Sequence, residues 1–90
     1  MLHDTPVKIL LIEDDEEDFI IARDLLGDIR GSKFELDWAK TYAEGLETLL
    51  RNQHDICLLD YRLGPRNGIE LLKVAIEREC QSPIILLTRA

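Results

Sequence analysis

The sequence predicts an α/β fold in which helices cover a parallel β-sheet. Three observations lead to this prediction. Apolar runs of strand length occur at residues 7–12, 34–38, 56–59 and 84–88. The stretches between these runs carry apolar residues at helical spacing, and the links from run to stretch are short and polar. Because strands that alternate with helices through short links form parallel sheets with right-handed crossovers, the predicted element order is β-α-β-α-β-α-β.

Acidic residues follow the first predicted strand and open the helix after it. Residues 7–12 are almost continuously apolar, which is typical of a strand buried on both faces of a sheet. Asp15 is a suitable N-cap for the helix, and the acids after it suit the positive end of the helix dipole. Gly31-Ser32 closes this helix. Its predicted apolar stripe consists of Phe19, Ala22, Leu25, Leu26 and Ile29.

The second strand is predicted to lie at an edge of the sheet. Residues 34–38 alternate between apolar and acidic side chains, which is typical of a half-exposed strand. A capping box at residues 41–44 marks the start of a helix that ends near Asn52. We interpret Trp38 and Tyr42 as packing residues rather than as a binding platform. The side chains predicted to face inward are Ala43, Leu46, Leu49 and Leu50.

The third strand ends in a carboxylate. Residues 56–59 are apolar and Asp60 follows them. A carboxylate is costly inside a core, so Asp60 is expected where the strand emerges. A loop with glycine and proline at residues 64–68 leads to a third helix, and residues 84–88 then form a fourth buried strand. The stripe of the third helix is predicted to be Ile69, Leu72, Ala75 and Ile76.

Length and composition exclude several classes of function. Ninety residues make one domain, 1–90, near the lower size limit for a self-sufficient core. The net charge of −7 argues against nucleic-acid binding, and no apolar run approaches the ~20 residues that span a bilayer. Cys57 and Cys80 are expected to be reduced thiols of a cytoplasmic protein, because no signal peptide precedes them. Zinc-ligand spacing is absent, and His3 and His54 are assigned no chemistry.

Polar residues stand at the ends of three predicted strands. Glu13 and Asp14 follow the first strand, Asp60 ends the third, and Thr88 ends the fourth. The carboxyl ends of parallel strands share one rim, where ligands bind in open α/β sheets, so these residues should converge there. Crowded carboxylates repel one another and raise one another's pKa values unless a cation lies among them. Mg²⁺, which prefers oxygen ligands, is the first candidate for that cation.

This constellation is suited to phosphoryl transfer. A carboxylate can act as the nucleophile in aspartyl-phosphate formation, and a metal beside it neutralises charge on the transferred group. Taken singly, each residue has a simpler interpretation. Glu13 and Asp14 can begin a helix, Asp60 can form a turn, and Thr88 can be a plain strand residue. Their joint placement at three strand ends favours a phosphoryl-transfer site.

Three segments of the sequence carry a family resemblance. They are Ile9 to Asp15 (Ile-Leu-Leu-Ile-Glu-Asp-Asp), Asp55 to Gly68, and Ile84 to Thr88 (Ile-Ile-Leu-Leu-Thr). In these segments the chain resembles the receiver domain of two-component response regulators, and together they span essentially the whole chain. The resemblance implies a flavodoxin-like fold, with the strand order 2-1-3-4 for the four strands present. It also implies a histidine kinase or a histidine phosphotransfer protein as the phosphoryl donor.

The resemblance also implies roles for individual residues. Asp60 would be the phosphoacceptor, and Thr88 the switch hydroxyl that turns toward the aspartyl phosphate. Mg²⁺ would be held octahedrally by Asp14, Asp60, the Arg62 backbone carbonyl and waters, with Glu13 acting through a water. The implied function is Mg²⁺-dependent phosphorylation on Asp60 in a phosphorelay. Such a domain is not an enzyme in the ordinary sense, because it catalyses only its own phosphorylation and dephosphorylation.

Three features depart from the family pattern. The proline that usually stands four residues after the phosphoacceptor is replaced by Gly64, and Pro65 follows it. Arg89 follows Thr88, where the family prefers a small residue. The sequence ends at Ala90, so the last helix, strand and helix of a receiver are expected to be missing, together with a lysine that pairs with the phosphoryl group. We therefore expect self-association, or pairing with the missing C-terminal segment. The contact would use the uncovered edge at residues 84–87 or the face of the first helix, where one flank of the Phe19–Ile29 stripe would be uncovered.

Two other functions stay open at this point. A receiver-like module that no longer switches would act only through protein interactions, and phosphoryl transfer from a small donor would distinguish it. A phosphohydrolase with an aspartate nucleophile commonly has a general acid two residues after that aspartate, and Arg62 stands there instead.

Overall fold

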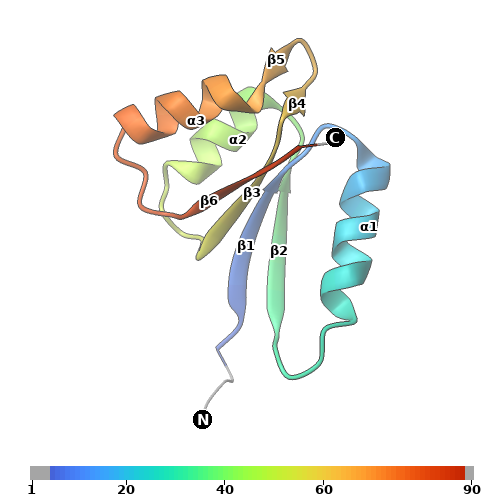
Figure 1. The fold of residues 1–90 in the computed structure, drawn as a ribbon. Coiled ribbons are helices and arrows are strands. Elements are labelled where there is room, and N and C mark those ends of the chain that lie inside the picture. Colours follow the sequence, from blue (N-terminus) through green and yellow to red (C-terminus); the bar gives the residue numbers. More distant parts are fainter. Residues whose placement is uncertain (1–4, 89–90) are drawn as a thin grey trace.

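The computed structural model describes residues 5–88, so the expectations about His3, Arg89 and Ala90 lie outside the described residues. Strands and helices alternate along this part of the chain (Figure 1). Within it, no helix is both long enough and apolar enough to cross a bilayer. The elements are β1 (Val7–Ile12), α1 (Glu16–Gly27), β2 (Phe34–Ala39), α2 (Tyr42–Leu49), β3 (Ile56–Asp60), β4 (Arg62–Leu63), β5 (Arg66–Asn67), α3 (Gly68–Glu77) and β6 (Ile84–Leu87).

Four strands form one parallel sheet in the order β2-β1-β3-β6. This is the flavodoxin-like order that the sequence predicted, with β6 as its fourth strand, so the predicted fold class is confirmed. β1 pairs with β2 on one side and with β3 on the other. Because Ile12 pairs with Leu59, the carboxyl ends of β1 and β3 emerge side by side.

The main hydrophobic core lies between the sheet and the helices α2 and α3. Residues paired across parallel strands point to the same face, so Leu10 and Cys57 share one face with Ile12 and Leu59. All four side chains are fully buried in one cluster, together with Leu71 of α3. Burial raises the pKa of the Cys57 thiol to about 12, so this thiol is protonated and inert at neutral pH.

The opposite face of the sheet is covered by α1, which packs on the edge strand β2 (Figure 1). Phe19 of this helix stacks on Trp38, with the two ring centroids 4.2 Å apart. Leu25 and Ile29, which the sequence placed in the apolar stripe, are 63% and 48% exposed. The exposure of Leu25 agrees with the expectation that one flank of this stripe is uncovered, and Ile29 lies beyond the helix, which ends at Gly27.

β6 is half exposed rather than buried on both faces. Ile84 and Leu86 pack against the main core, whereas Ile85 and Leu87 point to the α1 face and are 47% and 38% exposed. The apolar run predicted full burial, and this prediction is wrong for two reasons. In the described part of the chain β6 has only β3 as a strand neighbour, and α1 lies at the other end of the sheet, over β2.

The apolar stripes of α2 and α3 are largely confirmed, since Leu49 and Ala75 are buried in the core and Leu46 and Leu72 pack against it. Ala43 and Ile76 were predicted to face inward, but both are exposed. In α2 the backbone at Gly45 is buried directly on β1, since an added Cβ there would lie 2.6 Å from Cγ2 of Ile12. In α3 Ala75, which was predicted to face inward, is fully buried, and so is Leu71, which the sequence analysis missed. The close approach of a helix backbone to the sheet therefore decides which residues face inward.

Candidate functional site

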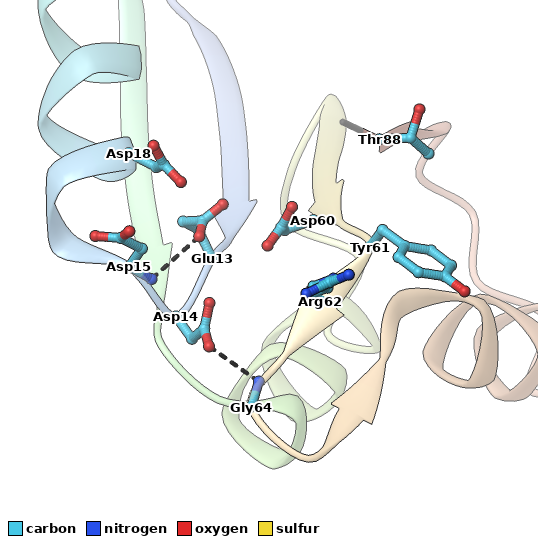
Figure 2. Close-up of a pocket in the computed structure, with 9 residues that line it drawn as sticks. All are labelled: Glu13, Asp14, Asp15, Asp18, Asp60, Tyr61, Arg62, Gly64 and Thr88. Atoms are coloured by element: carbon cyan, nitrogen blue, oxygen red, sulfur yellow. Dashed lines mark hydrogen bonds between the residues drawn. The ribbon is translucent and has the colours of Figure 1, made fainter. Parts of the chain in front are cut away.

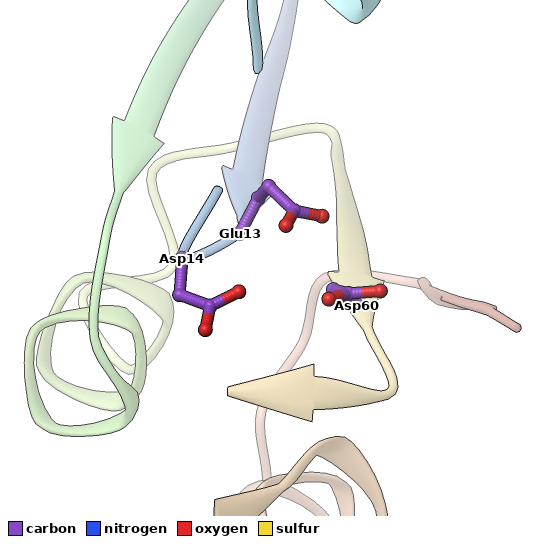
Figure 3. Close-up of side chains that lie close together, drawn as sticks. All are labelled: Glu13, Asp14 and Asp60. Atoms are coloured by element: carbon purple, nitrogen blue, oxygen red, sulfur yellow. The ribbon is translucent and has the colours of Figure 1, made fainter. Parts of the chain in front are cut away.

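Glu13, Asp14 and Asp60 lie together at the carboxyl-terminal edge of the sheet (Figure 3). One carboxylate oxygen from each residue lies within 4.8 Å of the other two. Glu13 and Asp14 follow the last residue of β1, and Asp60 is the last residue of β3. The pairing of these two strands in register therefore brings together the three acids that the sequence placed at this edge.

Asp60 is the most unusual of the three carboxylates. It is 9% exposed, and its backbone N–H and C=O groups belong to β3, so its position is fixed by the sheet. Burial, and after it the negative charge of Asp14, raise the pKa of Asp60 above the usual aspartate range. Backbone hydrogen bonds of Tyr61 and Arg62 and a side-chain hydrogen bond with Glu13 lower the pKa but do not cancel this rise. A nearby cation would offset both effects on the pKa, because its positive charge favours the ionised carboxylate.

Glu13 is 4% exposed and is held from three directions. Its backbone N–H donates to the carbonyl of Ala39 at 3.0 Å. Its carbonyl accepts a 2.7 Å hydrogen bond from Nε1 of Trp38, and its Oε1 accepts a 3.1 Å bond from the N–H of Asp15. Sequence reasoning gave Trp38 a packing role only, and no signal in the sequence pointed to its bond with Glu13.

Asp14 is exposed, and its carboxylate is oriented by a loop from elsewhere in the chain. The backbone N–H of Gly64 donates to Oδ2 of Asp14 at 2.9 Å (Figure 2). Gly64 lies in the turn of a hairpin in which Arg62 pairs with Asn67 and Leu63 with Arg66. The sequence predicted an irregular loop here and missed this two-stranded hairpin.

The acids lie in an open pocket that the other candidate residues also line (Figure 2). Thr88, the residue after β6, is exposed at its rim, as is Arg62 of β4. Asp15 also lines this pocket, although it caps α1 by accepting a 2.9 Å hydrogen bond from the N–H of Glu17. Asp18 is a further lining residue that the sequence analysis assigned to the helix N-terminus alone.

The residues present fit a hard divalent cation. The three clustered side chains offer only carboxylate oxygens, which are the ligands that Mg²⁺ prefers. The site is open on one side, so water can complete an octahedral shell. The raised pKa of Asp60 indicates that the hydrogen bonds around it only partly offset its burial and the charge of Asp14, so a cation would stabilise its ionised form. An oxygen-rich site of this kind can hold a cation beside a carboxylate that lines an open pocket.

Comparison with known proteins identifies the family. The profile of the response regulator receiver domain matches residues 9–90. The chain is 33% identical over 82 residues to the transcriptional regulatory protein DltR of Streptococcus agalactiae, and 38% identical over 88 residues to the transcriptional regulatory protein LytR of Staphylococcus aureus. These matches cover 91% and 93% of this chain. The chain belongs to the response regulator receiver domain family, a class used in two-component signalling.

Solved structures give the same assignment. The receiver domain of HemR from Leptospira biflexa, in its non-phosphorylated form, matches with a TM-score of 0.75 at 32% identity. The match covers 93% of this chain and 64% of that one. The response regulator MaeR bound to beryllium trifluoride matches with a TM-score of 0.79 at 30% identity, over 93% of this chain and 68% of that one. The chain spans about a third of the length of the curated relatives it matches.

Proposed function

We propose that this chain is the phosphoacceptor module of a two-component phosphorelay and that Asp60 is the residue phosphorylated. The observation that carries this proposal is the cluster at the end of β3, where the buried Asp60 carboxylate lies within 4.8 Å of Glu13 and Asp14. The phosphoryl donor is a histidine kinase or a histidine phosphotransfer protein, as for the family to which the chain belongs.

In the proposed reaction an Asp60 carboxylate oxygen attacks the phosphorus of the donor phosphohistidine. An O–P bond forms as the N–P bond breaks, and the donor imidazole keeps the electron pair of that bond. Asp14, Asp60 and the Arg62 backbone carbonyl would hold Mg²⁺, with Glu13 acting through a water. The bound cation supplies positive charge that neutralises the transferred phosphoryl group. In dephosphorylation water attacks the phosphorus of the aspartyl phosphate and the bond between phosphorus and the Asp60 oxygen breaks, so inorganic phosphate leaves and the free carboxylate is regenerated.

Thr88 is proposed as the switch hydroxyl. It lies at the rim of the same pocket, at the end of the strand that pairs with β3 next to Asp60. After phosphorylation its hydroxyl would donate to a phosphoryl oxygen. The domain thus catalyses only its own phosphorylation and dephosphorylation. We propose a cytoplasmic location, where the two free thiols would stay reduced.

A second candidate function is a receiver-like module that acts through protein contacts without switching. The exposed apolar residues Ile85 and Leu87 on β6, with Leu25 on α1, favour a contact surface on this side of the sheet. A second copy of the chain, or a further segment of the same receiver, would cover these side chains. This contact is compatible with phosphorylation, so the two functions differ only in whether Asp60 accepts a phosphoryl group.

Phosphorylation by a small donor tests the first proposal against the second. The chain is incubated with acetyl phosphate in MgCl₂, and its intact mass is measured. We expect one added phosphoryl group, which does not appear when the metal is removed with a chelator. If the folded chain shows no mass increase in MgCl₂, the phosphoacceptor function is excluded and the protein-contact module is the remaining candidate.

A further inference from the structure

The hydrogen bond between Gly64 and Asp14 joins two parts of the chain that are 50 residues apart in sequence. Asp14 is exposed, so its side chain would otherwise be free to sample several rotamers. The bond engages Oδ2 only. With that oxygen held by Gly64, the Asp14 carboxylate points toward Asp60, as Figures 2 and 3 show. The orientation of an exposed acid is therefore set by a backbone amide.

The conformation of Gly64 makes this amide available. Its φ is 64°, in the left-handed region that favours glycine, and Pro65 after it has the negative φ of all prolines. A positive φ followed by a negative one is the sign pattern of a type II′ hairpin turn. In a two-residue hairpin the ladder bonds use the flanking residues, here Leu63 and Arg66, so the Gly64 N–H is not needed by the ladder. A proline at residue 64 would have neither this φ nor an N–H.

The hairpin that carries Gly64 is itself firmly held. Leu63 is 3% exposed and belongs to the main core. The guanidinium carbon of Arg66 lies 3.5 Å from the ring centroid of Tyr42, a buried residue of α2. Asn67 caps α3 by accepting a 2.9 Å hydrogen bond from the N–H of Glu70. Contacts on both strands of the hairpin thus fix the turn, and the turn fixes Asp14.

We propose that Gly64 is a positioning residue for Asp14, which holds one carboxylate oxygen so that the other is preset for Mg²⁺. This inference rests on the proposed metal-dependent function of the same site. A preset ligand loses less conformational freedom when the cation binds, so affinity is gained without a further contact to the cation. Thermodynamic reciprocity requires the converse, that Mg²⁺ strengthens the attachment of the hairpin to the end of β1.

The test uses the full chain and Mg²⁺ itself, with backbone amide resonances as the readout. The variant Gly64→Pro/Pro65→Gly exchanges the two turn residues, which suits a type II turn and removes the N–H at residue 64. The matched control is Gly31→Ala. Gly31 also has a positive φ, 84°, and open space around it, but lies in the loop between α1 and β2, away from the pocket.

MgCl₂ titration of the wild-type chain should shift the Gly64 amide resonance with the same midpoint as the resonances of Glu13 and Asp60. The exchanged variant should bind Mg²⁺ about threefold to tenfold more weakly, the range expected for one net hydrogen bond. The Gly31→Ala control should keep the wild-type midpoint.

Three outcomes would count against these proposals, and they are distinguishable. Wild-type binding with equal affinity in the exchanged variant would overturn the role of Gly64 and leave the proposed function intact. A Gly64 amide resonance that does not shift while Mg²⁺ saturates the wild-type site would also overturn that role. This result does not depend on whether the variant folds. Absence of any Mg²⁺-dependent shift in the wild-type chain would overturn the proposed function, and the role of Gly64 with it.

Discussion

The indole Nε1 of Trp38 donates a 2.7 Å hydrogen bond to the backbone carbonyl of Glu13. This bond ties the edge strand β2 to the acidic cluster that follows β1. The same indole stacks on Phe19 of α1 with the two ring planes 4° apart. The Trp38 side chain thus contacts the helix, the edge strand and the start of the site. Its loss should therefore lower the free energy of unfolding of the domain.

Trp38→Phe should therefore destabilise the chain while keeping an aromatic ring against Phe19. The loss of the hydrogen bond leaves the Glu13 carbonyl without this donor, and we expect a cost of about 1 kcal/mol in the free energy of unfolding. Urea unfolding followed by circular dichroism measures this cost. An unchanged unfolding midpoint would mean that water replaces the indole without penalty.

Two neighbouring acids should differ in their effect on metal binding. Asp14→Asn should abolish Mg²⁺ binding, because Asp14 is a proposed direct ligand next to Asp60. Asp15→Asn should change the affinity little, since the Asp15 carboxylate caps α1 through the N–H of Glu17. Calorimetric titration of the two variants against wild type provides the comparison. Equal losses in both variants would show that the wrong acid has been assigned to the metal.

The raised pKa of Asp60 predicts a specific dependence of stability on pH. The folded state holds the Asp60 proton more tightly than the unfolded chain, in which the aspartate pKa is about 3.9. As pH rises from that value through the higher pKa of Asp60 in the fold, this residue makes the folded state progressively less stable. The side chain of the Asp60→Asn variant does not ionise in this pH range. The stability of this variant relative to wild type should therefore increase as pH rises across the same window.

Urea unfolding of wild type and Asp60→Asn, from acid to neutral pH in the absence of metal, measures this difference. Added Mg²⁺ should reduce the advantage of the variant at neutral pH, because the cation stabilises the ionised carboxylate. A stability difference that stays constant with pH would contradict the raised pKa.

The exposed apolar side chains on the α1 face predict self-association of the isolated chain. Ile85 of β6 is 47% exposed on this face, and Leu25 of α1 is 63% exposed. Sedimentation equilibrium at micromolar concentration should show a species larger than a monomer, and Ile85→Glu should shift it toward the monomer. Ile76→Glu is the matched control, since Ile76 is 66% exposed on α3, on the opposite face of the sheet. A compact wild-type monomer with a cooperative melt would refute this prediction.

The sequence predicted well those features that depend on periodicity and on strand order. The alternating pattern at residues 34–38 identified an outer strand of the sheet. The parallel arrangement of the strands then brought Glu13 and Asp14 to the same carboxyl-terminal end of the sheet as Asp60. These features follow from local patterns combined with one general rule of parallel sheets.

Features that depend on tertiary contacts were not predictable in this way. Ala43 was wrongly predicted to face inward in α2, where a glycine lets the helix backbone approach the sheet, as at Gly45 against Ile12. The bonds from Trp38 to Glu13 and from Gly64 to Asp14 join residues 25 and 50 positions apart, and no local pattern specifies such a partner. Ile76 has the spacing of a core residue but lies on a flank of α3 that no described element covers.

Whether Asp60 accepts the phosphoryl group is tested most directly by the intact mass of the chain and of its variants after acetyl phosphate treatment. In MgCl₂ the wild-type chain and the control Asp24→Asn, which alters an exposed aspartate of α1, should each gain one phosphoryl group. Asp60→Asn should gain none. Phosphorylation of Asp60→Asn to the wild-type extent would contradict the account and assign the reaction to another residue.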